Sequence, residues 1–400
     1  MRPFYFGVVL WGEEFRNYFL KFCLPSLLSS NNIPALENRT DSRFLICTTQ
    51  ADWTAMQANE TFELLKKQIK PVLLELKGLP SNGSKMQVMS EGHKALARRM
   101  HELRAYGTFI YPDTVFADGV VAECQRLAKQ GKKVVLAHCP RFANEGLLRE
   151  LDEKGLIKPG TPITLAPREL IALAFPHMHS ESRRYEWNAP YFYAESPVMV
   201  WWRIPEGLLV HTVTWAPMVV DYAAVTRHDT GTLDHWTIDG DYVHKNFSNP
   251  NDVHAVTESD SMTLMSFTPE SSLTYLPLRR GNLTSLPILG QWYRRFCLRA
   301  FLFSPAIDPL KRRLFVSTVK MAIATPGPSF ARIETKAAEM VTYSLHRSPT
   351  AREQRALYWL RIINQGLLLH FGFWIRKRAR FMKRIGLAKG LAAWPKTHSN

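Results

Sequence analysis

The feature that most constrains the fold is a regular alternation of apolar runs and amphipathic segments along residues 4–138. The short apolar runs are typical of strands that are buried on both faces of a sheet. The segments between them place apolar residues at every third or fourth position, which is typical of helices packed on such a sheet. The alternation therefore predicts an α/β fold built on an open, mostly parallel sheet with helices on both faces.

The same pattern assigns the individual elements. Strands are expected at 4–10, 43–48, 71–76, 107–113 and 133–138. A first helix is expected to end at Pro25 or at the turn 31–34, and further helices at 53–70, 91–106 and 120–130. From residue 160 onward, short segments rich in aromatic and histidine residues predict a mixed α+β second half.

Ligands of an open parallel sheet bind at the carboxyl ends of its strands. The residues that follow the first, second and fourth predicted strands should therefore meet in one crevice. They are Trp11, Gly12, Thr48, Thr49, Asp52 and Asp113.

The first third of the chain resembles a known family. The order is Trp-Gly after the first strand, then LPSLL and SSNNIPAL, then RFLICTT and finally TFIYPDTVFADG. Over about 1–145 this resembles the nucleotide-sugar half of GT-A-type glycosyltransferases of bacterial polysaccharide and glycoconjugate assembly. The resemblance implies a nucleotide-sugar donor in the crevice and a divalent cation, Mn or Mg, held by an acidic motif against the donor's diphosphate.

Asp113 matches the last acid of the Asp-x-Asp motif of this family, whereas Tyr111 stands at the position of the first acid. The cation could therefore be held by one carboxylate, by carboxylates from elsewhere in the chain, or not be used. The alternative interpretation of Asp113 is a turn residue beside Pro112. Asp118 is better interpreted as a turn or N-cap residue of the next helix.

A second acidic cluster occupies residues 227–260, which contain seven Asp or Glu and four His residues. Within it, Asp239 and Asp241 are expected to point to the same side of an extended segment. They could ligate a metal, hold sugar hydroxyls or act as the general base toward an acceptor. A solvated acidic loop is the alternative, and Glu195 is a further candidate base.

Histidines offer a competing enzyme class. His177 and His179 form an H-x-H pair that, with His138 and His211, would suit a zinc-dependent hydrolase. His211 is also a candidate metal ligand beside Asp113 and Asp241, although a hydrogen-bonded histidine on a strand is the ordinary outcome. A third interpretation is a scaffold without catalytic activity. Its best support is Tyr111, which stands where the family has an acid.

The basic character belongs to the last third of the chain. Residues 276–400 contain 23 Lys+Arg and 4 Asp+Glu, whereas 1–275 contain 28 and 31. We expect a nucleotide-sugar half at 1–160, an acceptor and catalytic half at 161–275 and a basic helical region at 276–400. Motifs of nucleic-acid recognition are absent from the sequence, so a nucleic-acid partner is disfavoured.

The segment 356–375 is mostly apolar, contains Arg361 and precedes the basic run 376–384. Placing Arg361 at the bilayer centre would cost about 2.5–3.5 kcal/mol, so an interfacial position is favoured. Each basic residue near an anionic leaflet contributes about 1 kcal/mol. We therefore expect a peripheral anchor on an anionic membrane surface.

The N-terminal segment and the cysteines indicate the cellular compartment in which we expect the protein to act. The apolar run 3–11 leads into Glu13 and Glu14, which is typical of a strand rather than a signal peptide. Five widely spaced cysteines do not form a disulfide or zinc pattern. We expect a bacterial cytoplasmic enzyme, peripheral to the inner membrane, that transfers a hexosyl or related sugar to a glycan or lipid-linked acceptor. The sequence leaves inversion or retention open.

Overall fold

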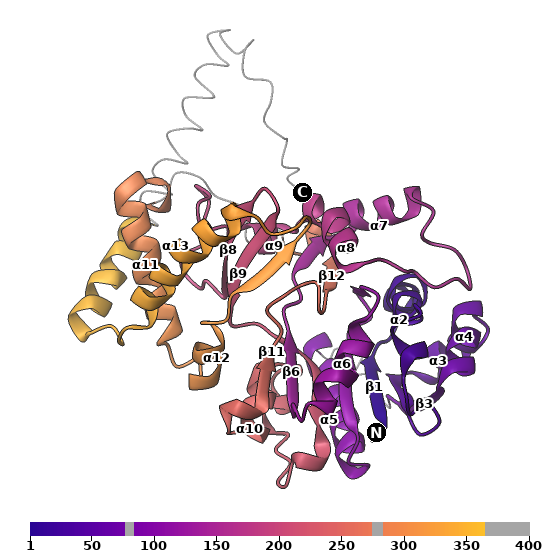
Figure 1. Cartoon of the computed structure of the whole chain (residues 1–400). Coiled ribbons are helices and arrows are strands. Elements are labelled where there is room, and N and C mark those ends of the chain that lie inside the picture. Colours follow the sequence, from indigo (N-terminus) through magenta and orange to yellow (C-terminus); the bar gives the residue numbers. More distant parts are fainter. Residues whose placement is uncertain (77–83, 274–282, 365–400) are drawn as a thin grey trace.

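A seven-stranded sheet organises the protein (Figure 1). The computed structural model describes residues 1–76, 84–273 and 283–364. The strand order is β11-β6-β10-β4-β1-β2-β3, and of these strands only β10 runs antiparallel to its neighbours. The strands are β1 (Phe4–Val9), β2 (Arg43–Thr48), β3 (Lys70–Glu75), β4 (Tyr106–Ile110), β6 (Val134–Ala137), β10 (Ala216–Asp221) and β11 (Val253–Ala255).

The central strand β1 is buried on both faces, as its continuous apolar sequence predicts. Its side chains alternate between two cores because successive residues of a strand point to opposite faces. Phe4, Phe6 and Val8 pack into one core. Tyr5 and Val9 pack into the other.

Helices cover both faces of the sheet. Helix α5 (Lys85–Glu102) contacts β1, β2 and β4 and contributes Leu96, Ala97 and Met100 to the core on its side. The opposite core receives side chains from α2 (Leu24–Leu27), α4 (Glu60–Gln68) and α6 (Val120–Lys129). The predicted fold class, an open and mostly parallel GT-A-like sheet with helices on both faces, is therefore confirmed.

The element boundaries agree with the sequence pattern to within about three residues in the sheet and differ more in three helical segments. The helix expected at 91–106 is α5, which begins at Lys85 and ends at Glu102, so that Tyr106 belongs to β4. The expected helix 53–70 is two helices, α3 (Gln50–Gln57) and α4, because Asn59 caps the second one through its side-chain oxygen. The first helical segment runs from α1 (Glu13–Tyr18) through a π-helical turn, η1 (Phe19–Cys23), into α2. The remaining helices of the middle of the chain are α7 (Asn144–Glu153), α8 (Pro167–Ala174), α9 (Ser180–Arg183) and α10 (Gly240–Asn246).

Two three-stranded sheets complete the described structure. One has the order β5-β12-β7, formed by β5 (Thr114–Phe116), β12 (Leu264–Thr268) and β7 (Arg141–Ala143). The other has the order β13-β9-β8, formed by β13 (Val319–Ala322), β9 (Gly207–Thr212) and β8 (Met199–Ile204). Trp201 of this second sheet joins the core beneath α5, whereas Trp202 packs with α11 (Pro287–Leu302) and α13 (Pro328–Leu345), so the sheet separates two hydrophobic layers (Figure 1).

The large sheet crosses the expected boundary at residue 160. Its strands β10 and β11 come from the segment 161–275 and lie between or beside strands of the first segment. The basic region was expected to be helical, and in its described part α11, α12 (Pro309–Leu314) and α13 are helices. The exception is β13, which pairs with β9 through Val319 and Val210. The division into three functional segments stays a prediction.

Within 1–76, 84–273 and 283–364, none of the helices combines the length and the apolar character needed to cross a bilayer. Most of the expected surface anchor, from residue 365 onward, lies outside the described residues.

The β8–β9 turn should depend on a glycine. Gly207 has a φ of +145°, and a Cβ built on it would lie 2.0 Å from the main-chain oxygen of Met321. We expect Gly207→Ala to destabilise the protein by at least about 2 kcal/mol, because backbone strain and a clash with main chain add together.

The matched control is Gly131→Ala, where φ is +81° and the built Cβ has no heavy atom within 4 Å. This variant should cost about 1 kcal/mol from backbone strain alone. Thermal and urea unfolding measure both values, and equal losses would contradict the clash.

Candidate functional site

The strand-end residues of β1 and β2 meet through the carboxylate of Asp52. Oδ2 of Asp52 accepts hydrogen bonds from the Gly12 main-chain N–H at 3.0 Å and from the Thr49 hydroxyl at 2.8 Å. Oδ1 pairs with the Arg16 guanidinium at 2.5 Å. The sequence prediction that Gly12, Thr49 and Asp52 come together at one edge is thus matched by the geometry.

These contacts decide what Asp52 can do. Burial acts to raise the pKa of this carboxyl, but the bonds from Gly12, Thr49 and Arg16 outweigh it and lower the pKa. The carboxylate is consequently charged and occupied by the protein's own donors. Asp52 shapes the edge of the sheet and is a weak candidate for direct ligand binding. Beside it, Trp11 is partly buried and Thr48 is fully buried.

Asp113 lies three residues beyond β4, at the same edge of the sheet, and directly precedes β5. Its main-chain oxygen accepts a hydrogen bond from the Phe267 N–H at 2.9 Å, which fixes the backbone. Its side chain is partly exposed. Within the described residues, no other side chain donates a hydrogen bond to its carboxylate. The position therefore has a rigid backbone and an unoccupied acid.

The surroundings of Asp113 are unfavourable to its charge. Burial raises the pKa of the carboxyl above its usual value, and the Arg141 guanidinium opposes this only in part. Asp113 in turn acts on Tyr18 and Cys23, which come from the helical segment with the π-turn. An acid at a strand end whose pKa is raised by burial is typical of a functional position.

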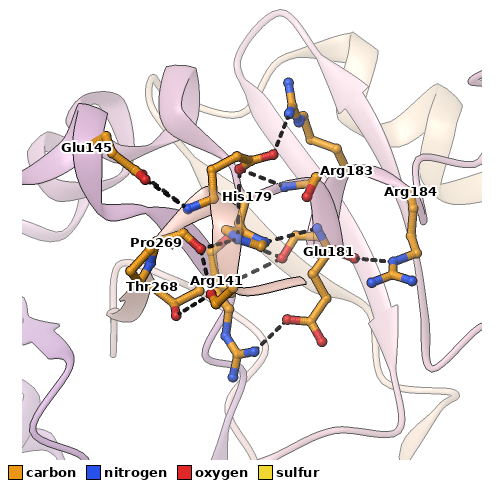
Figure 2. Close-up of polar contacts among 12 residues, drawn as sticks. Arg141, Glu145, His179, Glu181, Arg183, Arg184, Thr268 and Pro269 are labelled. Carbon is orange, nitrogen blue, oxygen red and sulfur yellow. Dashed lines mark hydrogen bonds and ion pairs between the residues drawn. The ribbon is translucent and has the colours of Figure 1, made fainter. Parts of the chain in front are cut away.

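Arg141 is a site residue that the sequence analysis did not single out. It begins β7, and its guanidinium also pairs with Glu181 Oε2 at 2.5 Å (Figure 2). Its main-chain oxygen accepts from the His179 N–H at 3.1 Å. The signal that could have found it is its place shortly after the strand 133–138, since that strand ends at the same edge.

Tyr111, at the position of the missing acid, is committed to the fold. Its hydroxyl donates to the Ile238 main-chain oxygen at 3.0 Å. Burial is the main cause of a strongly raised pKa, with smaller effects from Asp239 and Asp113. The phenol is therefore neutral and bonded, and it joins the end of β4 to the loop that carries Asp239.

Asp239 and Asp241 lie together, but the expected extended geometry is wrong. Asp239 is the N-cap of α10, and its side chain accepts from the Asp241 N–H at 2.8 Å. The N-cap bond favours a helical turn at Gly240 over a strand. Lys311 of α12 binds this pair, with Nζ 2.6 Å from Asp241 Oδ2 and 3.7 Å from Asp239 Oδ2.

The pair is partly exposed and is tied to α12 by Lys311. Burial raises the pKa of Asp241, Lys311 lowers it, and the neighbouring Asp239 raises it again. Lys311 is the second site residue that sequence analysis missed. It is separated from Asp241 by 70 residues and stands in a Lys-Arg-Arg run without a distinguishing local signal.

The proposed ligand set of Asp113, Asp241 and His211 is not assembled. Across the described ranges, no three His, Cys, Asp or Glu residues are grouped so that they could hold a metal. His211 is buried on β9, where Nδ1 donates to the Phe315 main-chain oxygen at 2.9 Å. Burial lowers its pKa to about 4, so His211 is a neutral core histidine.

Glu195 is likewise placed away from this cluster. Its main-chain oxygen accepts from Arg361 at 3.2 Å, and its carboxylate accepts from the Tyr193 hydroxyl at 3.4 Å. These contacts put Glu195 beside the helical layer of the basic region.

The H-x-H pair does not form a zinc site. His179 uses both ring nitrogens, since Nδ1 accepts from the Glu181 N–H at 3.0 Å and Nε2 donates to the Pro269 main-chain oxygen at 3.1 Å (Figure 2). A ring engaged in this way has no lone pair left for a metal. His177 instead contacts Glu150, with Nε2 2.7 Å from Oε2.

Comparisons with known proteins do not identify a family for this chain. The sequence matches none of the protein-family models and none of the curated proteins searched. Among solved structures, it is similar to S. aureus TarS, with 11% identity over 86% of this chain and 52% of that chain and a TM-score of 0.34.

Two further solved structures show a likeness in the same range. One is mouse xyloside xylosyltransferase 1 in its apo form, at 8% identity over 69% of this chain and 99% of that chain, with a TM-score of 0.30. The other is a Bacillus anthracis protein assigned as a glucose-1-phosphate thymidylyltransferase and bound to sucrose, at 9% identity, 36% and 57% coverage and a TM-score of 0.22. The chain spans little more than half of the Bacillus and S. aureus structures.

Asp52 should make the stability of the protein depend on acid pH. Because its pKa is lowered in the folded state, its contribution is present above the unfolded value near pH 4 and is lost as the pH falls through the folded value. We expect Asp52→Asn to cost about 1.5–3 kcal/mol at neutral pH and to cost progressively less on acidification. The exposed Asp41→Asn is the control, and urea unfolding across this range is the measurement. A pH-independent loss would contradict this account.

Proposed function

We propose that the protein is a glycosyltransferase that binds a nucleotide-sugar donor at the carboxyl edge of the large sheet. The observation that carries this proposal is Asp113, a partly exposed acid with a fixed backbone and a raised pKa at the end of β4. Open α/β sheets bind ligands at this edge. The tie between Gly12, Thr49 and Asp52 preorganises the neighbouring strand ends.

The site suits a cation that is held largely by its substrate. Asp113 offers a free carboxylate, whereas Tyr111 is bonded to Ile238 and supplies no ligand. Mn or Mg would therefore take one protein carboxylate and complete its coordination with diphosphate oxygens and water. When bound, such a cation supplies positive charge against the departing diphosphate. Arg141 acts on the same carboxylate and would add a second positive charge.

The acceptor base is assigned to the pair Asp239 and Asp241. Both Asp239 and Asp113 act electrostatically on Tyr111, so the pair lies close to the proposed donor site. The raised pKa of Asp241 suits a group that takes a proton from an acceptor hydroxyl. Lys311 holds the carboxylate in place and opposes the rise of its pKa. A glycan or lipid-linked acceptor at a cytoplasmic membrane face is the proposed co-substrate.

Asp113→Asn tests whether this acid is functional or a turn residue. The raised pKa means that ionised Asp113 costs stability above about pH 4, so its neutral analogue should leave the thermal midpoint unchanged or raised. Turnover should fall at least about 100-fold, because the cation and diphosphate lose their protein anchor. Thermal unfolding and a transfer assay with a panel of UDP-, GDP- and CMP-sugars, with and without Mn, measure the two effects.

Asp118→Asn is the matched control, because the pKa of Asp118 is shifted in the opposite direction. Asp118 accepts from the Asn31 N–H at 2.9 Å and from the Asn31 side chain at 2.6 Å, and these bonds lower its pKa against the effect of burial. The control should lower the thermal midpoint and keep turnover. A destabilised but active Asp113→Asn would assign Asp113 to the turn, and native protein that is silent with every donor would favour the scaffold.

Lys311→Met tests the base assignment. Removing the cation should raise the pKa of Asp241 further, since burial and Asp239 then act unopposed. We expect the acidic limb of the kcat profile to move to higher pH. Lys320→Met, which removes an ion pair with Glu334 at 3.2 Å, is the control and should leave the profile in place. An unshifted limb in Lys311→Met would exclude Asp241 as the base.

A further inference from the structure

Exposed apolar side chains of the described residues are concentrated in one region. Thirteen large apolar residues are exposed, and eight of them lie within 286–292 and 358–363. We call these eight the apolar patch, and they are Leu286, Ile288, Leu289, Trp292, Tyr358, Trp359, Ile362 and Ile363.

The two windows belong to one surface. Residues 351–364 form a helical segment, and the Asn364 side-chain oxygen accepts from the Leu283 N–H at 2.8 Å, immediately before α11. Arg361 acts electrostatically on Cys297 and Tyr293 of α11, and Arg299 of α11 pairs with Glu353 of the terminal segment at 2.5 Å. The terminal helical segment is therefore fastened along α11, and both helices carry exposed apolar side chains.

The last two turns of the terminal segment expose apolar residues on the side opposite the one that packs toward α11. Leu357, Leu360, Arg361 and Asn364 follow the spacing of one helix face and pack toward α11. Tyr358, Trp359, Ile362 and Ile363 follow the same spacing on the outer face. A surface helix of a globular protein is normally polar on its outer face. This outer face thus requires an apolar partner.

The extent of exposure supports the same point. Ile288 is 87% exposed and Trp359 is 62% exposed. Tyr358 and Trp359 stack edge to face, with ring centroids 5.6 Å apart. Trp and Tyr are preferred at the boundary between hydrocarbon and headgroups, because one end of each ring is apolar and the other can hydrogen-bond.

Charge identifies the partner. Residues 365–400, which continue directly from the patch, contain eight Lys+Arg and no Asp or Glu. Exposed Arg352 and Arg355 precede it on the same helical segment. The nearby Glu353 is already paired with Arg299 at 2.5 Å and Arg347 at 2.8 Å. The sequence that follows the patch therefore adds positive charge and contains no acidic residue that could pair with it.

We propose that the apolar patch is a membrane-docking face that inserts into the headgroup region of an anionic bilayer. A second copy of the chain would bring two strongly basic segments together, and like charge opposes that arrangement. Anionic phosphate headgroups instead satisfy both the basic excess and the apolar surface. This inference concerns a different surface from the proposed donor site and does not depend on the transferase proposal.

Vesicle co-sedimentation of the full chain tests the proposal. Native protein should bind vesicles of phosphatidylcholine with phosphatidylglycerol much more tightly than vesicles of phosphatidylcholine alone. The double variant Ile288→Ser/Trp359→Ser should bind the anionic vesicles about tenfold more weakly, because two deeply inserted side chains are lost. The loss should persist at high salt, since apolar contact is not screened.

The matched control is Trp236→Ser, which removes a Trp that is also 62% exposed but lies outside the patch. It should bind vesicles like the native protein, and an unchanged far-ultraviolet circular dichroism spectrum with a cooperative thermal transition checks that each variant is folded. Equal vesicle binding by the double variant and the native protein would overturn the proposal. So would a lipid-free dimer that the double variant disrupts, because a second copy would then be the partner.

Discussion

The burial of β1 on both faces is the constraint on which the rest of the structure depends. Helix α5 approaches this strand so closely that a Cβ at Gly92 would lie 2.5 Å from a methyl carbon of Val9, and one at Gly7 would lie 2.7 Å from Met100. Close packing of this kind fixes both the position of the strand and its register with β2 and β4. Since these three strands run parallel, their carboxyl ends are brought to one edge.

At that edge lie two acids whose pKa values are shifted in opposite directions. Asp52 is satisfied by Gly12, Thr49 and Arg16, which lowers its pKa and stabilises the fold. Asp113 has a fixed main chain but no comparable donors, and its pKa is raised. One acid is thus satisfied by the fold, whereas the other, two strands away at the same edge, has no side chain in the described part of the chain that donates to it. The raised pKa of Asp113 is the reason we propose that it binds a ligand rather than only supporting the fold.

The sequence predicts the sheet well because its information is local. The strands 43–48 and 4–10 are recognisable from apolar runs, and their parallel order follows from the intervening helices. Pairings between distant segments are not local. The contact of Lys311 with Asp241 and the effect of Arg141 on Asp113 arise only when separate elements pack together. The helical turn at Gly240 also escaped prediction, because alternate acids fit a strand as well as an N-cap.

The histidines show that a local sequence pattern can also predict a site that the folded chain does not form. An H-x-H pair offers two imidazoles of the right type for zinc, but His179 spends both nitrogens on main-chain groups of two segments that meet only in the folded chain. Residue type alone therefore predicts too many metal sites. The hydrogen bonds of the folded chain show which histidines still have a free nitrogen. The same reasoning applies to the apolar patch. Trp201 and Trp359 are alike in the sequence, but Trp201 is buried and Trp359 is 62% exposed, so only the folded chain separates a core residue from a docking residue.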